Sequence, residues 1–110
     1  MRYEVNQNGD CTVFRIDEER FDAKLAPEFR AQIESVMSEL SPHLVLDIGA
    51  VKFMDSSGLG AVMGVYKLLR DKKISVACPQ KPVQDLFKLT RMDRLIKTYD
   101  SVESATTAQV

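Results

Sequence analysis

The stretch VKFMDSSGLGAVMG, from Val51 to Gly64, contains the corner that decides the fold. Before Asp55-Ser56-Ser57-Gly58 the chain has the character of an apolar strand, and after it apolar residues recur at helical spacing. Asp and Ser favour helix starts because a side-chain oxygen accepts a hydrogen bond from a backbone N–H that has no helical partner. Glycine at position 58 relaxes the backbone at a tight corner. One such side chain suffices for a cap, so capping alone leaves the two hydroxyls and the carboxylate unexplained.

Composition limits what kind of protein this is. A chain of 110 residues with 45% hydrophobic and 28% charged residues has the size and composition of one domain, which we assign to residues 1–110. The net charge of −1 provides no basic field for nucleic acid or an anionic membrane. No signal peptide and no apolar run of about 18 residues is visible, so we expect a cytoplasmic protein without a membrane contact.

The sequence gives no sign of a metal site or a cofactor. Its two cysteines, Cys11 and Cys78, form no CxxC pair and no cluster with His43, the single histidine. Both cysteines lie in expected strands among apolar residues, so we predict two buried free thiols.

Apolar periodicity predicts the order β-β-α-β-α-β-α-β-α. Alternating segments around Asn8-Gly9-Asp10 indicate a hairpin, and 43–48, 74–78 and 95–99 read as further strands. We expect the helices to begin near Pro27, at the corner, near Pro82 and at Asp100, where Glu103 completes a capping box. The expected apolar stripes are Phe29, Ile33, Val36, Met37 and Leu40; then Leu59, Val62, Met63, Tyr66 and Leu69; then Val83, Leu86, Phe87 and Leu89.

These elements predict an α/β fold with a single mixed β-sheet. Strand–helix–strand crossovers from residue 43 onward imply parallel pairing, while the hairpin adds antiparallel pairing at the start. We therefore expect about five strands, with about four helices packed mainly against one face.

Four functions of the corner can be weighed. Beyond a helix start, a dinucleotide site is disfavoured because the glycines give G-x-G-x-x-x-G rather than G-x-G-x-x-G. A serine hydrolase is disfavoured because G-x-S-x-G is absent and the single possible base, His43, begins the preceding strand. A phosphoacceptor serine fits better, since a phosphate at a helix N-terminus meets N–H groups and the positive end of the dipole.

The segment FMDSSGLGAVMGVYK closely resembles the signature of the STAS domain found in bacterial anti-sigma factor antagonists. The resemblance continues in RFDAKLAPEFR, in LVLDIGAVKFMDSSGLG and in PQKPVQDLFKLTRMDRLIKTYDSVESA, so it covers nearly the whole chain. It implies the STAS fold, and it implies a phosphorylation-controlled, partner-switching protein that is not itself an enzyme.

The resemblance also implies partners. An anti-sigma factor that is a serine kinase of the histidine-kinase ATPase fold would bind the unmodified protein, release its sigma factor and phosphorylate the antagonist. A serine phosphatase would reset the cycle, and the nucleotide would belong to the kinase. A second member type is a scaffold subunit in transport assemblies without phosphoswitching; the complete Asp-Ser-Ser-Gly favours the switch.

The resemblance assigns residues as well. Ser56 maps to the acceptor, Ser57 to a position that caps or orients, Asp55 to the motif aspartate and Asp22 to a loop beside the acceptor. Gly58, Leu59 and Gly60 complete the expected partner-binding surroundings. One departure stands out: Arg20 occupies a position where the family commonly has a turn glycine, which puts the conformation of that loop in question.

Overall fold

The computed structural model describes residues 1–107. Five strands form the main sheet in the order β1-β2-β4-β6-β7, and two short strands, β3 and β5, form a second sheet. The strands are β1 (Tyr3–Asn8), β2 (Cys11–Ile16), β3 (Arg20–Phe21), β4 (His43–Asp47), β5 (Phe53–Met54), β6 (Lys73–Ala77) and β7 (Lys97–Tyr99). The helices are α1 (Ala26–Val36), α2 (Ser56–Leu68), α3 (Lys81–Leu89) and α4 (Val102–Thr107), with 3₁₀ turns η1 (Met37–Glu39) and η2 (Met92–Arg94).

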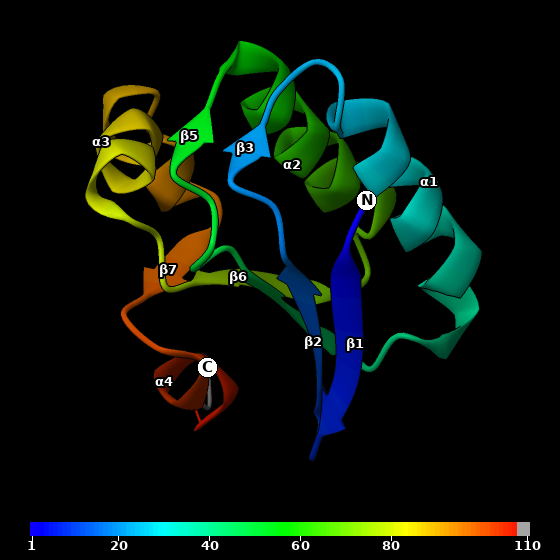
Figure 1. The fold of residues 1–110 in the computed structure, drawn as a ribbon. Coiled ribbons are helices and arrows are strands. Elements are labelled where there is room, and N and C mark those ends of the chain that lie inside the picture. Colours follow the sequence, from blue (N-terminus) through cyan, green and yellow to red (C-terminus); the bar gives the residue numbers. More distant parts are fainter. Residues whose placement is uncertain (108–110) are drawn as a thin grey trace.

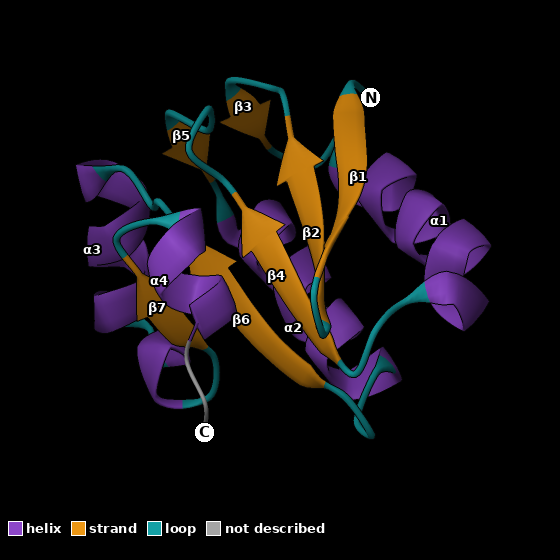
Figure 2. Cartoon of the chain, turned by 90° about the horizontal axis from the view of Figure 1, so that it is seen from below, coloured by secondary structure: helices purple, strands orange, loops and turns teal. Residues whose placement is uncertain are grey.

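The main sheet is mixed, as the sequence predicts. β1 pairs antiparallel with β2, and Gly9 adopts a positive φ of 63° in the turn between them. β2, β4, β6 and β7 pair parallel. Helices α1 and α2 lie on one side of the sheet and α4 on the other (Figures 1 and 2).

The core is divided by the sheet. The larger cluster takes Phe29 and Ile33 from α1, Val62 and Val65 from α2, and Phe87 from α3. The smaller cluster lies on the α4 side, where Ala105 packs with Cys11, Val13, Val45 and Ala77. Because both faces are covered, Cys11–Phe14 of β2 and His43–Leu46 of β4 are buried throughout. The expectation of helices mainly on one face is confirmed.

Several local predictions are wrong. Cys78 lies just beyond β6 with a positive φ of 62° and is half-buried, so only Cys11 is the buried thiol that we expected. Leu89 is 82% exposed because α3 ends there, beyond the edge of the core. The last helix is capped by Ser101, whose Oγ accepts the Ser104 N–H at 3.0 Å, instead of by Asp100.

The buried faces of α1 and α2 also differ from the predicted stripes. Helix α1 ends at Val36, and Met37 is exposed in the following 3₁₀ turn. In α2 the buried residues are Gly58, Ala61, Val62 and Val65, followed by Leu69. Leu59, Met63 and Tyr66 are half-buried and form one flank of this face. The buried face of α2 is therefore rotated about the helix axis from the face that the sequence predicts.

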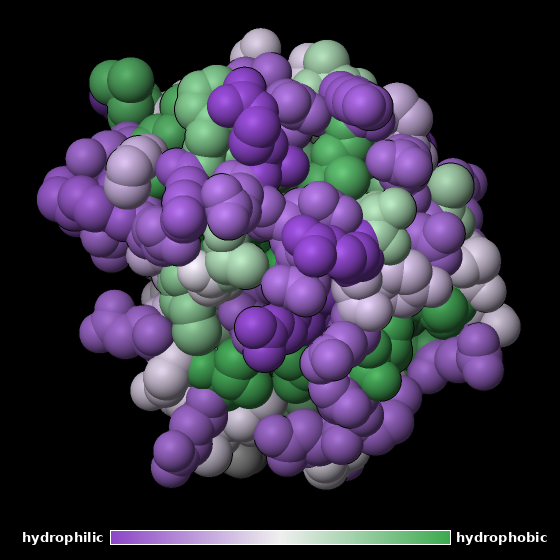
Figure 3. All heavy atoms as spheres, viewed as in Figure 1, coloured by the Kyte–Doolittle hydropathy of each residue, from purple (hydrophilic) through white to green (hydrophobic). Residues whose placement is uncertain are grey.

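The surface is mainly hydrophilic on the face drawn in Figure 3, where hydrophobic side chains show through in separate groups. The large hydrophobic residues that are exposed include Phe53, Leu89 and Leu95. Within residues 1–107, no helix has the length and apolar character needed to cross a membrane.

Candidate functional site

The corner that begins α2 is built against a small parallel pair of strands that the sequence did not reveal. Arg20 lies opposite Phe53 in this pair, and Phe21 lies opposite Met54. The pair is extended by hydrogen bonds from the N–H groups of Lys52 and Phe53 to the Glu19 carbonyl, at 2.8 and 3.1 Å. Each strand has two residues, which is too short for an alternating pattern to be recognised.

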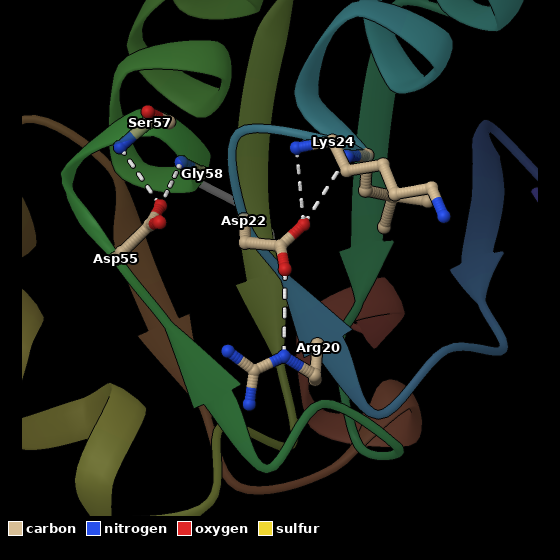
Figure 4. Close-up of polar contacts among 7 residues, drawn as sticks. Arg20, Asp22, Lys24, Asp55, Ser57 and Gly58 are labelled. Atoms are coloured by element: carbon tan, nitrogen blue, oxygen red, sulfur yellow. Dashed lines mark hydrogen bonds and ion pairs between the residues drawn. The ribbon is translucent and has the colours of Figure 1, made fainter.

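Asp55 is the N-cap of α2. Its backbone is extended, with φ −105° and ψ −173°, and its Oδ1 accepts from the N–H of Ser57 at 2.9 Å and of Gly58 at 3.0 Å (Figure 4). One carboxylate oxygen thus satisfies two of the N–H groups that a helix start leaves without partners. Of the two roles expected for Ser57, capping or orienting, the structure gives the cap to the Asp55 side chain, and Ser57 contributes only its backbone N–H to it.

Position 58 requires a glycine because the backbone of β3 approaches it closely. A Cβ placed on Gly58 would lie 2.2 Å from the carbonyl oxygen of Phe21 and 3.0 Å from Cγ of Met54. The same Phe21 carbonyl accepts the Asp55 N–H at 3.4 Å. The first turn of α2 is therefore packed directly onto β3. Gly58 is buried, so it contributes to packing and does not form part of the accessible surface.

Ser56 is the first residue of α2, and it is exposed. Asp55, Ser57 and Leu59 around it are half-buried, and Gly60 is exposed with no atom within 4 Å of where a Cβ would stand. Of the two adjacent serines, Ser56 is the more exposed residue.

Asp22 lies beside the first turn of α2 (Figure 4). Its Oδ1 accepts from the N–H groups of Lys24 and Leu25, at 3.1 and 3.3 Å, and Oδ2 lies 3.4 Å from Nε of Arg20. Desolvation acts to raise the pKa of Asp22, but the bonds from Leu25, Arg20 and Lys24 together hold that pKa below its ordinary value. Asp22 is thus an ionised carboxylate at neutral pH.

Arg20 does not distort its loop. Its backbone is extended within β3 and does not need the positive φ that would favour glycine. Its guanidinium carbon lies 4.5 Å from the ring centroid of Phe53, on the paired strand. Arg20 is thereby held between an aromatic face and the Asp22 carboxylate, a placement that the sequence alone could not reveal.

His43 takes no part in this corner. It is buried at the start of β4, where Nδ1 lies 3.3 Å from Sγ of Cys11 and Nε2 lies 2.8 Å from Oγ of Ser75. Burial lowers the pKa of His43, and the nearby Lys73 lowers it further. Burial also raises the pKa of the Cys11 thiol. These three side chains form a polar cluster under α4, where the carbonyl oxygen of Thr106 accepts from the Cys11 thiol at 3.7 Å. The expectation that neither cysteine clusters with His43 is therefore wrong for Cys11.

Comparison with known proteins agrees with this architecture. The family model described as STAS domain matches residues 2–105. The anti-sigma F factor antagonist of Paenibacillus polymyxa is 33% identical over 76 residues, which are 67% of this chain and 65% of that protein. The chain thus aligns with somewhat less than two thirds of the length of that relative.

Solved structures share the fold at low sequence identity. An anti-sigma factor antagonist from Mycobacterium paratuberculosis superimposes with a TM-score of 0.86 at 24% identity, covering 96% of this chain and 91% of that one. The Bacillus cell fate determinant SpoIIAA in its phosphorylated form gives a TM-score of 0.70 at 18% identity, covering 96% of both chains. At these identities the likeness establishes the fold.

Proposed function

The chain belongs to the STAS domain family, and on that premise we propose that it is a phosphorylation-controlled partner switch whose acceptor is Ser56. In the unmodified state it binds an anti-sigma factor that is also its serine kinase, and it thereby releases the sigma factor or other target. Phosphorylation of Ser56 ends that binding, and a serine phosphatase restores it. The chain itself carries out no catalysis in this cycle.

One observation carries the proposal: Ser56 is an exposed residue with a hydroxyl side chain at the first position of a helix whose cap is already provided by Asp55. Because Ser56 is not needed to close the helix, its hydroxyl can be modified without loss of the hydrogen bonds that start α2. The 33% identity to an anti-sigma F factor antagonist supports the same function.

The charges at the corner explain how a phosphate would act. Phosphorylation adds about −1.5 to −2 charges at neutral pH. Asp55 already accepts from Ser57 and Gly58, so the phosphate would meet the helix dipole together with two neighbouring carboxylates, Asp55 and Asp22. The attraction of the phosphate to the helix dipole and its repulsion by the carboxylates then partly offset each other inside the domain. The main effect is on the binding of a partner that must cover this negative corner.

The test is phosphorylation with purified components. The chain and the serine kinase that acts on it are incubated with ATP, and the modified residue is mapped by mass spectrometry. We expect a single phosphate on Ser56, and none in the Ser56→Ala variant, while Ser57→Ala is phosphorylated like the native chain. Phosphate on Ser57 in the native chain would contradict the assignment.

The alternative is a scaffold subunit that assembles without phosphorylation. The complete Asp55-Ser56-Ser57-Gly58 motif favours the switch over this alternative. The two functions differ in one measurable respect: a scaffold retains its partner when Ser56 is replaced by Asp, whereas a switch loses it. Partner capture by native and Ser56→Asp chains therefore separates them.

A further inference from the structure

A cavity of about 630 Å³ lies at the C-terminal end of α2, lined by Tyr66, Lys67, Arg70 and Lys72. Lys67 is in the last turn of the helix, and Arg70 and Lys72 follow it in the turn that leads to β6. Among the described residues, three of the four that line the cavity are cations, and none is a carboxylate. Residues 66–73 hold four basic side chains and one acidic side chain, Asp71, in a chain with a net charge of −1, so positive charge is concentrated locally.

Within the part of the chain that the structure describes, the three cations are not neutralised by ion pairs. Among the ion pairs formed within residues 1–107, none includes Lys67, Arg70 or Lys72. Lys72 is half-buried and donates to the Leu40 carbonyl at 3.2 Å, which fixes its ammonium group and leaves two of its three N–H groups for other acceptors. Lys67 and Arg70 are exposed, so their charged groups can be reached by another molecule.

The helix dipole accounts for only part of this arrangement. A cation near a helix C-terminus is favourable, but the effect fades within the last turn. Helix α3 illustrates the simpler case, with Lys88 in its last turn. At the end of α2, Arg70 and Lys72 lie beyond the C-cap residue Leu69 and share one cavity with Lys67, where they repel one another.

We propose that this cavity is a docking site for an acidic segment of a partner protein. The open position of Lys67 and Arg70 suits carboxylate side chains that approach from outside, and the Arg70 guanidinium can bind one of them in a bidentate manner. Tyr66 adds an aromatic ring and a hydroxyl that can donate to another carboxylate.

This site is separate from the phosphorylation corner. Ser56 and the cavity lie at opposite ends of α2, a helix of 13 residues and hence about 20 Å long. The separation between a phosphate on Ser56 and the cavity therefore exceeds the Debye length, which is about 8 Å at physiological ionic strength. The cavity therefore binds acidic segments whether or not Ser56 is phosphorylated, and it does not depend on the proposed function.

The probe is an acetylated, amidated hexaglutamate peptide, with a hexaglutamine peptide for comparison, titrated into the ¹⁵N-labelled chain. We expect hexaglutamate to shift the amide signals of residues 66–72 and to bind more weakly as ionic strength rises. Removing one cation, in Lys67→Gln or Arg70→Gln, is expected to weaken binding roughly 2- to 5-fold, as for solvent-exposed ion pairs. Lys88→Gln is the matched control, since it removes a cation from the other helix end, and it should bind as the native chain does.

Several results would overturn the proposal. These are shifts spread over the whole surface, equal binding of hexaglutamine, or equal weakening by Lys88→Gln. Pyrophosphate that occupies the same residues more tightly than hexaglutamate would instead assign the cavity to a small phosphate-bearing ligand. The Ser56→Ala chain should bind the peptide unchanged, so this test and the phosphorylation test fail independently.

Discussion

The carbonyl oxygen of Phe21 lies so close to Gly58 that a Cβ on that glycine would stand 2.2 Å from it. This contact joins β3 to the first turn of α2. It places the loop of Asp22 next to the helix start that carries Ser56, so the accessible site depends on a buried contact.

Replacing Gly58 with Ala should therefore destabilise the fold. The new methyl group must displace a strand backbone instead of a flexible side chain, and we expect a loss of about 1–3 kcal/mol in the free energy of unfolding. Urea unfolding measures it. Gly60→Ala is the matched control: it lies in the same helix with nothing within 4 Å, and it should be neutral or stabilising by up to about 1 kcal/mol. Equal effects of the two substitutions would show that the close approach is not restrictive.

Asp55→Ala should lower the free energy of unfolding by about 1 kcal/mol, because two N–H groups at the start of α2 lose their acceptor. Asp55→Asn should retain most of the stability, since its side-chain oxygen can accept the same bonds. Ser57→Ala should change stability by less than about 0.5 kcal/mol. A larger loss for Ser57→Ala than for Asp55→Ala would return the capping role to Ser57.

Ser56→Asp should leave the fold intact. The added charge lies at the favourable end of the helix dipole but beside Asp55, and we expect the melting temperature to change by only a few degrees. Ser57→Asp provides the comparison, because it adds the same charge at a half-buried position and should cost more stability. Differential scanning calorimetry of both variants distinguishes the positions. If the Ser56→Asp variant no longer unfolds cooperatively, the Ser56 side chain is needed for the fold.

The buried His43 predicts a dependence of stability on pH. Burial and Lys73 hold the pKa of His43 below the ordinary value of about 6.5, so the unfolded chain binds more protons in the interval between the two values. Stability should therefore be full above about pH 6.5 and should decrease as the pH falls below it. The lowered pKa of Asp22 affects stability only at more acidic pH, from the ordinary aspartate value of about 4 downward.

Urea unfolding from about pH 8 to about pH 5 measures this effect. His43→Gln should be less stable than the native chain at neutral pH, because its bonds with Cys11 and Ser75 are lost, but its stability should be less dependent on pH. An identical slope in both chains would show that other groups cause the dependence.

Arg20 and Phe53 should show energetic coupling. The guanidinium lies over the ring at 4.5 Å on an exposed surface, where such contacts contribute about 0.5–1 kcal/mol. A double-mutant cycle with Arg20→Gln and Phe53→Leu isolates this contribution from the nearby ion pair with Asp22. If the two substitutions change the free energy of unfolding in a strictly additive way, Arg20 is held by Asp22 alone.

Much of the fold could be predicted because it follows from local chemistry. The Asn8-Gly9 turn, the helix start at the Asp55 corner and the buried strand from His43 each depend on a few adjacent residues. Errors arose where an element ends, as at Leu89, because an amphipathic pattern indicates which face is apolar but not how far the core extends.

The candidate site was predictable only in part. The sequence, with its resemblance to the STAS family, proposed Ser56, but it could not show that Asp55 is the cap or that Gly58 meets Phe21. These relationships depend on β3 and β5, two-residue strands that are stabilised by each other and by the packing of α2, with no pattern of their own.

The sequence by itself thus determined the mixed main sheet, the order of its five strands and the four helices along the chain, and the start of α2 at the Asp55 corner, since periodicity and capping act over a few residues. Ser56 was singled out by the resemblance to the STAS family. Only the tertiary structure decided how Arg20 meets Phe53, why His43 is buried with Cys11, and that three cations share a cavity. The physical reason is that these contacts join residues from different strands, or from a helix and the turn after it, and their geometry is set by how the core packs.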